Sequence, residues 1–164
     1  MMNEQDVVGL LKTIKSIGID VWIDGGWGVD ALIGHQTRSH NDIDIFIKKI
    51  NSAAFTQMMV SKGYRETKMD YSTANHTVWQ DSHGHIIDLH LFEFGEAGNI
   101  YYDGESYPAA ILNGTGMIGD VKVCCLTAEA QLEYHQGYAI TEKDIHDVFL
   151  LCKTFKLPMP PHYG

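Results

Sequence analysis

The sequence is short of basic residues. It has 12 Lys and Arg against 21 Asp and Glu, which gives a formal net charge of −9 at pH 7. No segment gathers Lys and Arg into a basic stripe, and the negative field of the chain would repel a duplex nucleic acid. We therefore expect no nucleic-acid partner. An acidic pocket for a cationic small molecule agrees better with this charge.

Long hydrophobic runs are also absent from the sequence. A transmembrane helix needs roughly 20 consecutive apolar residues, and no run approaches that length. Residues 1–6 are acidic, whereas a signal peptide begins with basic residues. Apolar residues make up 45% of the chain, which is sufficient for a hydrophobic core. These features predict no membrane partner and a cytoplasmic location.

Cysteine is scarce, and the number is odd. The three cysteines are Cys124, Cys125 and Cys152. Reduced thiols in a cytoplasmic protein are the simplest interpretation of this pattern. Cys124 and Cys125 lie in an apolar run, where a thiolate would be disfavoured. The sequence therefore argues against a catalytic thiol.

Periodicity and capping residues predict an alternation of helices and strands. We expect helices over 3–17, 28–33, 51–62, 127–136 and 141–156, and strands over 21–24, 41–47, 64–69, 76–81 and 85–94. We also expect irregular structure over 95–116, a hairpin over 117–126 that turns at Gly119-Asp120, and an extended arm after Pro158. This order predicts an α+β fold with a small mixed sheet. The fold would form a single domain over 1–164, with 127–164 as a helical C-terminal extension.

Two carboxylates stand out at the start of one predicted strand. Asp42 and Asp44 are two residues apart, so a strand would point both to the same side while Ile43 and Ile45 face the core. Convergent carboxylates suit Mg²⁺, which prefers hard oxygen ligands and completes its shell with water and substrate phosphates.

A glycine pair precedes these carboxylates, at the end of the preceding strand. Gly25 and Gly26 have no Cβ, so their N–H groups can approach a polyphosphate closely. Arg38 could hold phosphate oxygens in a bidentate fork, or it could form a salt bridge to Asp30 or another local carboxylate.

A third carboxylate, Asp88, interrupts the apolar series of residues 86–92. It could complete the Mg²⁺ site or act as general base on an acceptor hydroxyl. Acidic residues at strand ends that merely stabilise loops are the alternative. A zinc hydrolase built from His83, His85, Asp88 and His90 is a further alternative. The position of His83 and His85 in or beside a turn, and the opposite parity of His85 and Asp88, argue against it.

Two further groups of residues are candidates for substrate contacts. Lys143, near the start of the last predicted helix, could reach a nucleotide phosphate or ribose, although the sequence alone favours a solvated helix face as the explanation. Tyr101 and Tyr102 suit a sugar-like acceptor. For Trp79 and Phe92 we favour ordinary core packing.

These motifs resemble the antibiotic nucleotidyltransferases of the polymerase-β-like superfamily. The resemblance covers nearly the whole chain and depends on the following residues: Gly25-Gly26-Trp27, Asp30, Arg38, His40 and Asp42-Ile43-Asp44. The length, the segment 83–90 and the predicted helix with 142–144 are most similar to the small lincosamide nucleotidyltransferases. Many members of the superfamily have Ser where this chain has Gly26, so the serine contact to phosphate is missing here.

The resemblance implies transfer of AMP from ATP to a hydroxyl of lincomycin or clindamycin, with release of pyrophosphate. It implies that Gly25 and Gly26 hold the β- and γ-phosphates, and that Arg38 and Lys143 contact the nucleotide. Asp42 and Asp44 would bind Mg²⁺, and Asp88 would be a metal ligand or the general base. We expect the acceptor near His90, Glu93, Tyr101 and Tyr102, and Glu93 is the alternative base. A homodimer is also expected.

Two rival functions remain open from the sequence. An aminoglycoside nucleotidyltransferase would suit the negative charge, because aminoglycosides are polycations. A non-catalytic nucleotide-binding or antitoxin-like module could keep the same fold without turnover.

Overall fold

Strand β2 (Asp42–Lys48) lies near the middle of a mixed sheet in the computed structural model, which describes residues 1–135 and 139–164. The main path of the sheet runs β3-β4-β5-β2-β1-β9-β8. β2 is parallel to β5 and antiparallel to β1, and β1 is parallel to β9. The strands are β1 (Trp22–Asp24), β3 (Arg65–Thr67), β4 (His76–Gln80), β5 (Ile86–Phe94), β8 (Gly114–Ile118) and β9 (Val121–Cys125). The predicted α+β fold with a mixed sheet is confirmed.

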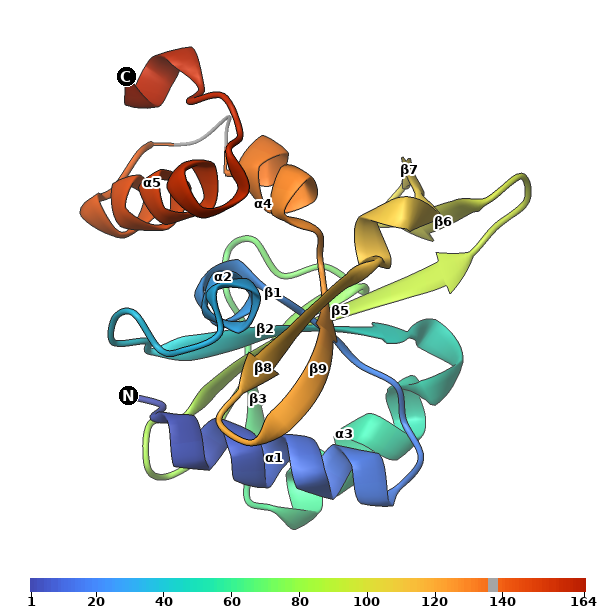
Figure 1. Cartoon of the computed structure of the whole chain (residues 1–164). Coiled ribbons are helices and arrows are strands. Elements are labelled where there is room, and N and C mark those ends of the chain that lie inside the picture. Colours follow the sequence, from blue (N-terminus) through green and yellow to red (C-terminus); the bar gives the residue numbers. More distant parts are fainter. Residues whose placement is uncertain (136–138) are drawn as a thin grey trace.

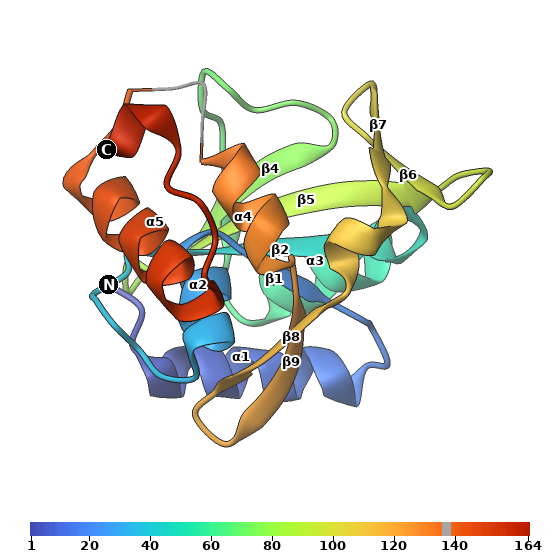
Figure 2. The same ribbon diagram turned by 45° about the horizontal axis from the view of Figure 1, so that its top comes forward.

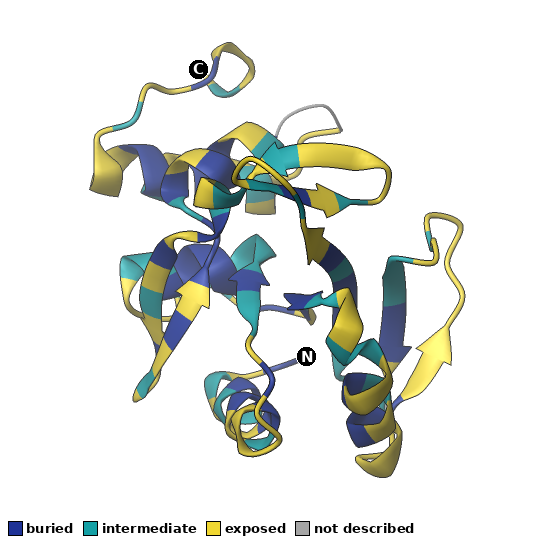
Figure 3. Cartoon of the chain, turned by 90° about the vertical axis from the view of Figure 1, so that its right-hand side faces the viewer, coloured by how far each residue is buried: buried dark blue, intermediate teal, exposed yellow. Residues whose placement is uncertain are grey.

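The two faces of the sheet have different roles. Ile43, Ile45 and Ile47 of β2 are buried in the main hydrophobic core. Figure 1 shows the helices α1 (Glu4–Ser16) and α3 (Ser52–Ser61) on one side of the sheet and α4 (Ala128–Tyr134) and α5 (Glu142–Phe155) on the other. α1 turns its apolar stripe inward, and the buried stripes of the helices are the dark segments in Figure 3. Strand alternation therefore leaves the opposite face of β2 for polar residues.

The predicted helix caps are mostly confirmed. The Asn3 side chain accepts a hydrogen bond from the Asp6 amide, and Thr141 and Asp144 form the same reciprocal capping box at α5. Thr127 caps α4. Asn51, the first residue of the predicted helix 51–62, takes the N-cap position of α3, but its side chain makes no cap hydrogen bond, and a 3₁₀ turn over Lys49–Asn51 leads into the helix.

Helix α2 (Gly25–Ile33) begins three residues earlier than predicted, at the glycine pair itself. Gly25 has φ of +63°, a left-handed conformation that lets the chain turn from β1 directly into the helix. The glycine pair is therefore the first turn of a helix, where backbone N–H groups lack intrahelical partners.

The segment 95–116 is more regular than expected. It contains the hairpin of β6 (Asn99–Tyr102) and β7 (Glu105–Pro108), a 3₁₀ turn over Ala109–Leu112 and the start of β8. Asp103 and Gly104 both have positive φ and form the turn of this hairpin. Figure 2 shows the hairpin beyond the end of β5, on the other side of the molecule from α5.

The C-terminal segment also departs from the prediction. The predicted extended arm is wrong, because the chain forms a 3₁₀ turn over Pro161–Tyr163 and the Tyr163 hydroxyl donates to the His135 carbonyl. Residue 136, the predicted end of the fourth helix, lies outside the described residues. Within the described ranges, no helix combines the length and the apolar character needed to cross a bilayer.

Candidate functional site

Three carboxylates come together on the polar face of β2 and β5. The parallel register aligns Asp44 with Asp88, and Asp42 lies two residues before Asp44 on the same face of β2. Asp88 is buried, with 6% of its surface exposed. The sequence predicted the parity of Asp42 and Asp44, and the register adds Asp88 from a strand that follows about forty residues later.

Burial and neighbouring carboxylates raise the pKa of two aspartates at this site. Burial, followed by the charges of Asp44 and Asp88 and a hydrogen bond with Asp88, raises the pKa of Asp42 to about 7. Burial and the charge of Asp44 also raise the pKa of Asp24, which pairs with Asp44 across β1 and β2. A cluster of this kind is stabilised by a bound cation, because a cation offsets the repulsion between the carboxylates.

The donor set of this cluster fits Mg²⁺. Carboxylate oxygens are hard ligands, and Mg²⁺ needs only one or two of them when substrate phosphates and water supply the rest. Among the described residues, no group of three or more His, Cys, Asp or Glu side chains is arranged as a closed metal site. A cation at Asp42 and Asp44 would therefore depend on oxygens from outside the protein.

The zinc alternative is not supported by the side-chain positions. The His85 imidazole lies 2.8 Å from Asp81, and the His83 side chain is 79% exposed beside the same carboxylate. Both histidines belong to the turn after β4. His90 faces the carboxylate cluster instead.

Two histidines each contact one carboxylate of the cluster. His90 Nε2 lies 3.0 Å from Asp44 Oδ1, and His76 Nε2 lies 3.0 Å from Asp88 Oδ1. Burial lowers the pKa of His90, but the hydrogen bond and charge of Asp44 outweigh burial, so this pKa lies above its usual value.

The glycine pair lies directly against these residues. A Cβ on Gly25 would approach Asp44 Oδ2 to 2.2 Å, and a Cβ on Gly26 would approach an Arg38 terminal nitrogen to 2.4 Å. Only glycine at both positions leaves room for the carboxylate and the guanidinium. The first turn of α2 therefore exposes its backbone at the site where the resemblance expects phosphates.

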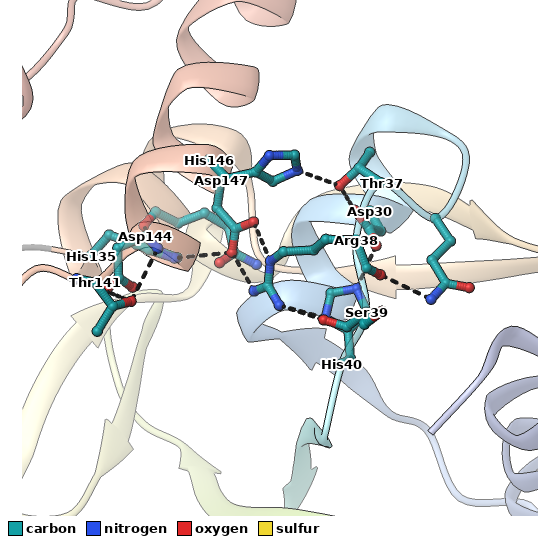
Figure 4. A network of polar contacts seen from close by, with 12 residues as sticks. Asp30, Thr37, Arg38, Ser39, His40, His135, Thr141, Asp144, His146 and Asp147 are labelled. Carbon is teal, nitrogen blue, oxygen red and sulfur yellow. Dashed lines mark hydrogen bonds and ion pairs between the residues drawn. The ribbon is translucent and has the colours of Figure 1, made fainter. Parts of the chain in front are cut away.

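Arg38 is held by Asp147 of α5, as Figure 4 shows. The guanidinium donates from Nε to Oδ1 at 2.8 Å and from a terminal nitrogen to Oδ2 at 2.6 Å. The suggested Asp30 salt bridge is wrong, because Asp30 is hydrogen bonded to His40 and Thr37. The partner is also not a local carboxylate, since Asp147 lies 109 residues away in the sequence. Arg38 remains at the edge of the pocket beside Gly26.

A polar pocket of about 400 Å³ opens between the glycine turn and α5. Its lining brings together three of the predicted nucleotide contacts, Gly25, Gly26 and Arg38, with the fourth, Lys143. The remaining lining residues are Asp24, Asp44, Tyr134, His135, Thr141, Asp144 and Asp147. The mixture of cationic groups and free helix N–H groups suits a polyphosphate.

A second pocket, of about 230 Å³, is mainly aromatic. Its lining residues are Asp24, Phe46, His90, Ile100, Tyr102, Tyr107, Ile111, Leu126 and Tyr134. The Tyr102 hydroxyl lies 2.8 Å from His90 Nδ1. Because Asp24 and Tyr134 line both pockets, the two pockets adjoin beside the carboxylates.

Two of the predicted acceptor residues lie elsewhere. Tyr101 is 47% exposed and its ring covers Gly95, and its partner across the strands, Glu93, is exposed as well. Strand alternation explains both positions, since Glu93 and Tyr101 have the opposite parity to His90 and Tyr102. Neither residue is among those that line the two pockets. Asp88 is absent from both linings as well but, unlike Glu93, it lies beside Asp44 in the register of β2 and β5.

Trp79 and Phe92 are buried, as expected for core residues. The described cysteines form no disulfide, and burial raises the pKa of the Cys125 thiol to about 12, which disfavours a reactive thiolate.

The sequence reasoning missed four residues of the site: Asp24, His76, His135 and Asp147 as the partner of Arg38. Asp24 directly precedes the glycine pair in the sequence, and this position could have indicated that it belongs to the site. His76 and Asp147 had no comparable signal, because their partners depend on strand register and on how α5 docks.

Carboxylates on neighbouring strands, beside a glycine turn that starts a helix, define the nucleotidyltransferase class of fold and site. The family model described as Aminoglycoside-2''-adenylyltransferase matches residues 6–151, and the chain belongs to this family. The predicted resemblance to antibiotic adenylyltransferases is thereby confirmed, and the family implies a nucleoside triphosphate as co-substrate.

Individual relatives support the same assignment. The chain is 27% identical to a lincosamide resistance protein of Staphylococcus haemolyticus, over 90% of this chain and 92% of that protein. It is 37% identical to a 2''-aminoglycoside nucleotidyltransferase of Klebsiella pneumoniae, but only over 38% of this chain and 36% of that protein.

Solved structures show the same fold. The crystal structure of the lincosamide antibiotic adenylyltransferase LnuA, lincomycin-bound, matches with a TM-score of 0.80 and 28% identity, over 92% of this chain and 96% of that one. The crystal structure of ANT(2")-Ia in complex with adenylyl-2"-tobramycin matches with a TM-score of 0.75 and 20% identity, over 93% and 88% of the two chains.

Proposed function

We propose that this protein transfers AMP from ATP to a hydroxyl group of a lincosamide such as lincomycin or clindamycin, and releases pyrophosphate. The observation that carries the proposal is the alignment of Asp44 with Asp88 on β2 and β5, beside the Gly25 turn. The lincosamide assignment is supported by relatives of that specificity that match about nine-tenths of the chain.

The polar pocket would bind the nucleotide. Gly25 and Gly26 offer the amides of the first turn of α2 to the β- and γ-phosphates, and Arg38 and Lys143 supply positive charge from the lining of the pocket. Phosphoryl and nucleotidyl transfer depend on positioning and electrostatic stabilisation rather than on covalent catalysis by the protein. These residues would hold the leaving group in line with the attacking hydroxyl.

Asp42 and Asp44 would hold Mg²⁺. The bound metal would neutralise negative charge on the triphosphate. The repulsion of Asp42 by the charges of Asp44 and Asp88 supports this role.

The aromatic pocket would bind the acceptor, with Asp88 as the general base. Asp88 accepts the proton of the acceptor hydroxyl, whose oxygen forms a bond to the α-phosphorus of ATP. The bond from the α-phosphorus to the bridging oxygen of the β-phosphate breaks, and pyrophosphate leaves. Phe46 and Tyr102 offer apolar and hydroxyl-bearing surfaces to a thiosugar and its amide-linked ring, beside His90.

An aminoglycoside acceptor is the second candidate. The description of the family model and the net charge of −9 favour it, because aminoglycosides are polycations. The aromatic lining of the acceptor pocket supports the lincosamide, which carries more apolar surface.

A panel of acceptors with labelled ATP tests the proposal. Lincomycin, clindamycin, kanamycin and tobramycin are each incubated with ATP and Mg²⁺, and the products are analysed by mass spectrometry and by pyrophosphate release. We expect a mass gain of one AMP unit on the lincosamides. Modification of the aminoglycosides alone would overturn the lincosamide assignment, and ATP binding without pyrophosphate release would identify a non-catalytic module. Parallel reactions without Mg²⁺, and with a zinc chelator, test whether the reaction depends on Mg²⁺ or on zinc.

A cytoplasmic location and a homodimer complete the proposal. The three unpaired cysteines and the use of ATP support the first, and the resemblance supports the second. Because the C-terminal tail folds back on its own chain, it does not support a dimer. Cell fractionation and light scattering coupled to gel filtration would test the two statements.

A further inference from the structure

Two imidazole rings stack behind the carboxylate cluster. The ring centroids of His76 and His90 lie 4.3 Å apart with an interplanar angle of 26°, and the two residues are direct neighbours across β4 and β5. Each ring directs Nε2 at a different carboxylate, His90 at Asp44 and His76 at Asp88. The stacked pair therefore contacts the cluster at two separate points.

Backbone hydrogen bonds and a ring contact hold His76 in place. Its amide donates to Thr73 Oγ1 at 3.0 Å, and its carbonyl accepts from the Thr73 amide at 2.9 Å. Tyr71 also packs against the ring, at a centroid distance of 5.2 Å and an interplanar angle of 35°. Since two rings and a turn restrict the imidazole, its Nε2 has little freedom to move away from Asp88.

The hydrogen bond to His76 restricts Asp88. An ionised carboxylate only accepts hydrogen bonds, so the Nε2 of His76 carries the proton and donates it to Oδ1. One oxygen of Asp88 is thus engaged, and the carboxyl plane is set by a neighbour that is itself held in place. Asp88 also shares a hydrogen bond with Asp42 in this structure, and the proposed role as a base needs that bond to give way to the acceptor hydroxyl.

We propose that His76 is a positioning residue for Asp88, which it orients so that the second carboxylate oxygen faces the acceptor hydroxyl. This inference rests on the proposed adenylyl transfer, in which Asp88 takes the hydroxyl proton. His76 touches neither the nucleotide pocket nor the acceptor pocket among the residues that line them. Its contribution should therefore appear in turnover and not in substrate binding.

The test compares two substitutions of His76. His76→Phe keeps an aromatic ring between Tyr71 and His90 but removes the donor. His76→Gln restores an amide N–H at nearly the position of Nε2. His83→Phe, in the exposed turn after β4, is the matched control for loss of a histidine.

We expect His76→Phe to lower kcat by about 10- to 100-fold, the range typical of second-layer partners, with KM for both substrates within about twofold. His76→Gln should recover most of kcat, and calorimetry should give an unchanged Kd for ATP in both variants. His83→Phe should behave as the unsubstituted protein.

A kcat of His76→Phe within about twofold of the unsubstituted protein would overturn the inference. Equal losses in the Phe and Gln variants, together with a lower melting temperature, would also overturn it, because they would indicate a purely structural role. Failure of the unsubstituted protein to modify any acceptor would instead refute the proposed function.

Discussion

Asp147 in α5 and Arg38 after α2 form a two-point ion pair across 109 residues of sequence, with N–O distances of 2.8 and 2.6 Å. The Asp147 side chain is 2% exposed and that of Arg38 is 18% exposed. His135 approaches the same carboxylate at 3.9 Å. The pair attaches the C-terminal helix to the glycine turn, and it sets where the guanidinium lies relative to Gly26.

Substitution of Asp147 should therefore weaken nucleotide binding. Asp147→Asn leaves the guanidinium without its charge partner, and breaking such a buried pair costs about 3–5 kcal/mol. We expect a lower unfolding free energy and a KM for ATP raised by about tenfold, with KM for lincomycin nearly unchanged. Glu142→Gln, on the exposed first turn of α5, serves as the control. A normal KM for ATP would show that Arg38 is not a nucleotide contact.

The same pair predicts a pH dependence of stability. Burial raises the pKa of Asp147, but the hydrogen bonds and charges of Arg38 and His135 outweigh burial and hold it below its ordinary value of 3.8. A carboxyl whose folded pKa is depressed contributes stability above its unfolded pKa and loses it as pH falls through the folded pKa. Between pH 6 and pH 3, urea unfolding should therefore show a larger loss for the unsubstituted protein than for Asp147→Asn. Parallel curves for the two proteins would contradict the assigned pKa.

Features of this fold that depend on residues close together in the sequence could be predicted from it. Asn3 and Thr141 predicted the starts of two helices, because the side chain of each accepts a hydrogen bond from a backbone amide three residues later. Asp42 and Asp44 shared a face because strand parity has a period of two. The site residues on β2 followed from the same rule.

Long-range pairings were not readable. Asp88 joins Asp44 only because β5 adopts one register against β2, and a shift by one residue would have turned Asp88 to the other face. Tyr101 was misplaced because the hairpin of β6 and β7 was not predicted, whereas the position of Glu93 follows from the local parity of β5. The pairing of Arg38 with Asp147 depends on how α5 packs against the rest of the chain. Local periodicity in the sequence does not predict that packing.

Gly25 offers a direct test of the phosphate turn. Gly25→Ala places a methyl group where Asp44 Oδ2 lies, and it adds strain at a left-handed φ. We expect turnover to fall by at least about tenfold, because displacement of a catalytic group by about 1 Å can cost 100-fold. Gly34→Ala also adds strain at a positive φ, of +101°, but a Cβ there has no close neighbour. A kinetic defect in Gly34→Ala as large as in Gly25→Ala would attribute the effect to strain alone.

The carboxylate cluster should be required for turnover but not for folding. Asp42→Asn and Asp44→Asn should each lower turnover at least ~100-fold, the scale of a lost electrostatic group. In the presence of a chelator at pH 7, Asp42→Asn should melt at the same temperature as the unsubstituted protein or higher, because its carboxyl is crowded by Asp44 and Asp88. Near-normal turnover in either variant would remove the proposed metal site.

The acceptor pocket can be filled without touching the nucleotide pocket. Ile111 lines only the aromatic pocket, so Ile111→Trp should occupy space that the proposed lincosamide needs. Overpacking costs roughly 1–3 kcal/mol, which is small enough to keep the protein folded. We expect KM for lincomycin to rise more than about tenfold while KM for ATP changes less than twofold. Ile145→Trp, at a position 52% exposed on α5, controls for the added indole. A change in KM for ATP with normal KM for lincomycin would reverse the assignment of the two pockets.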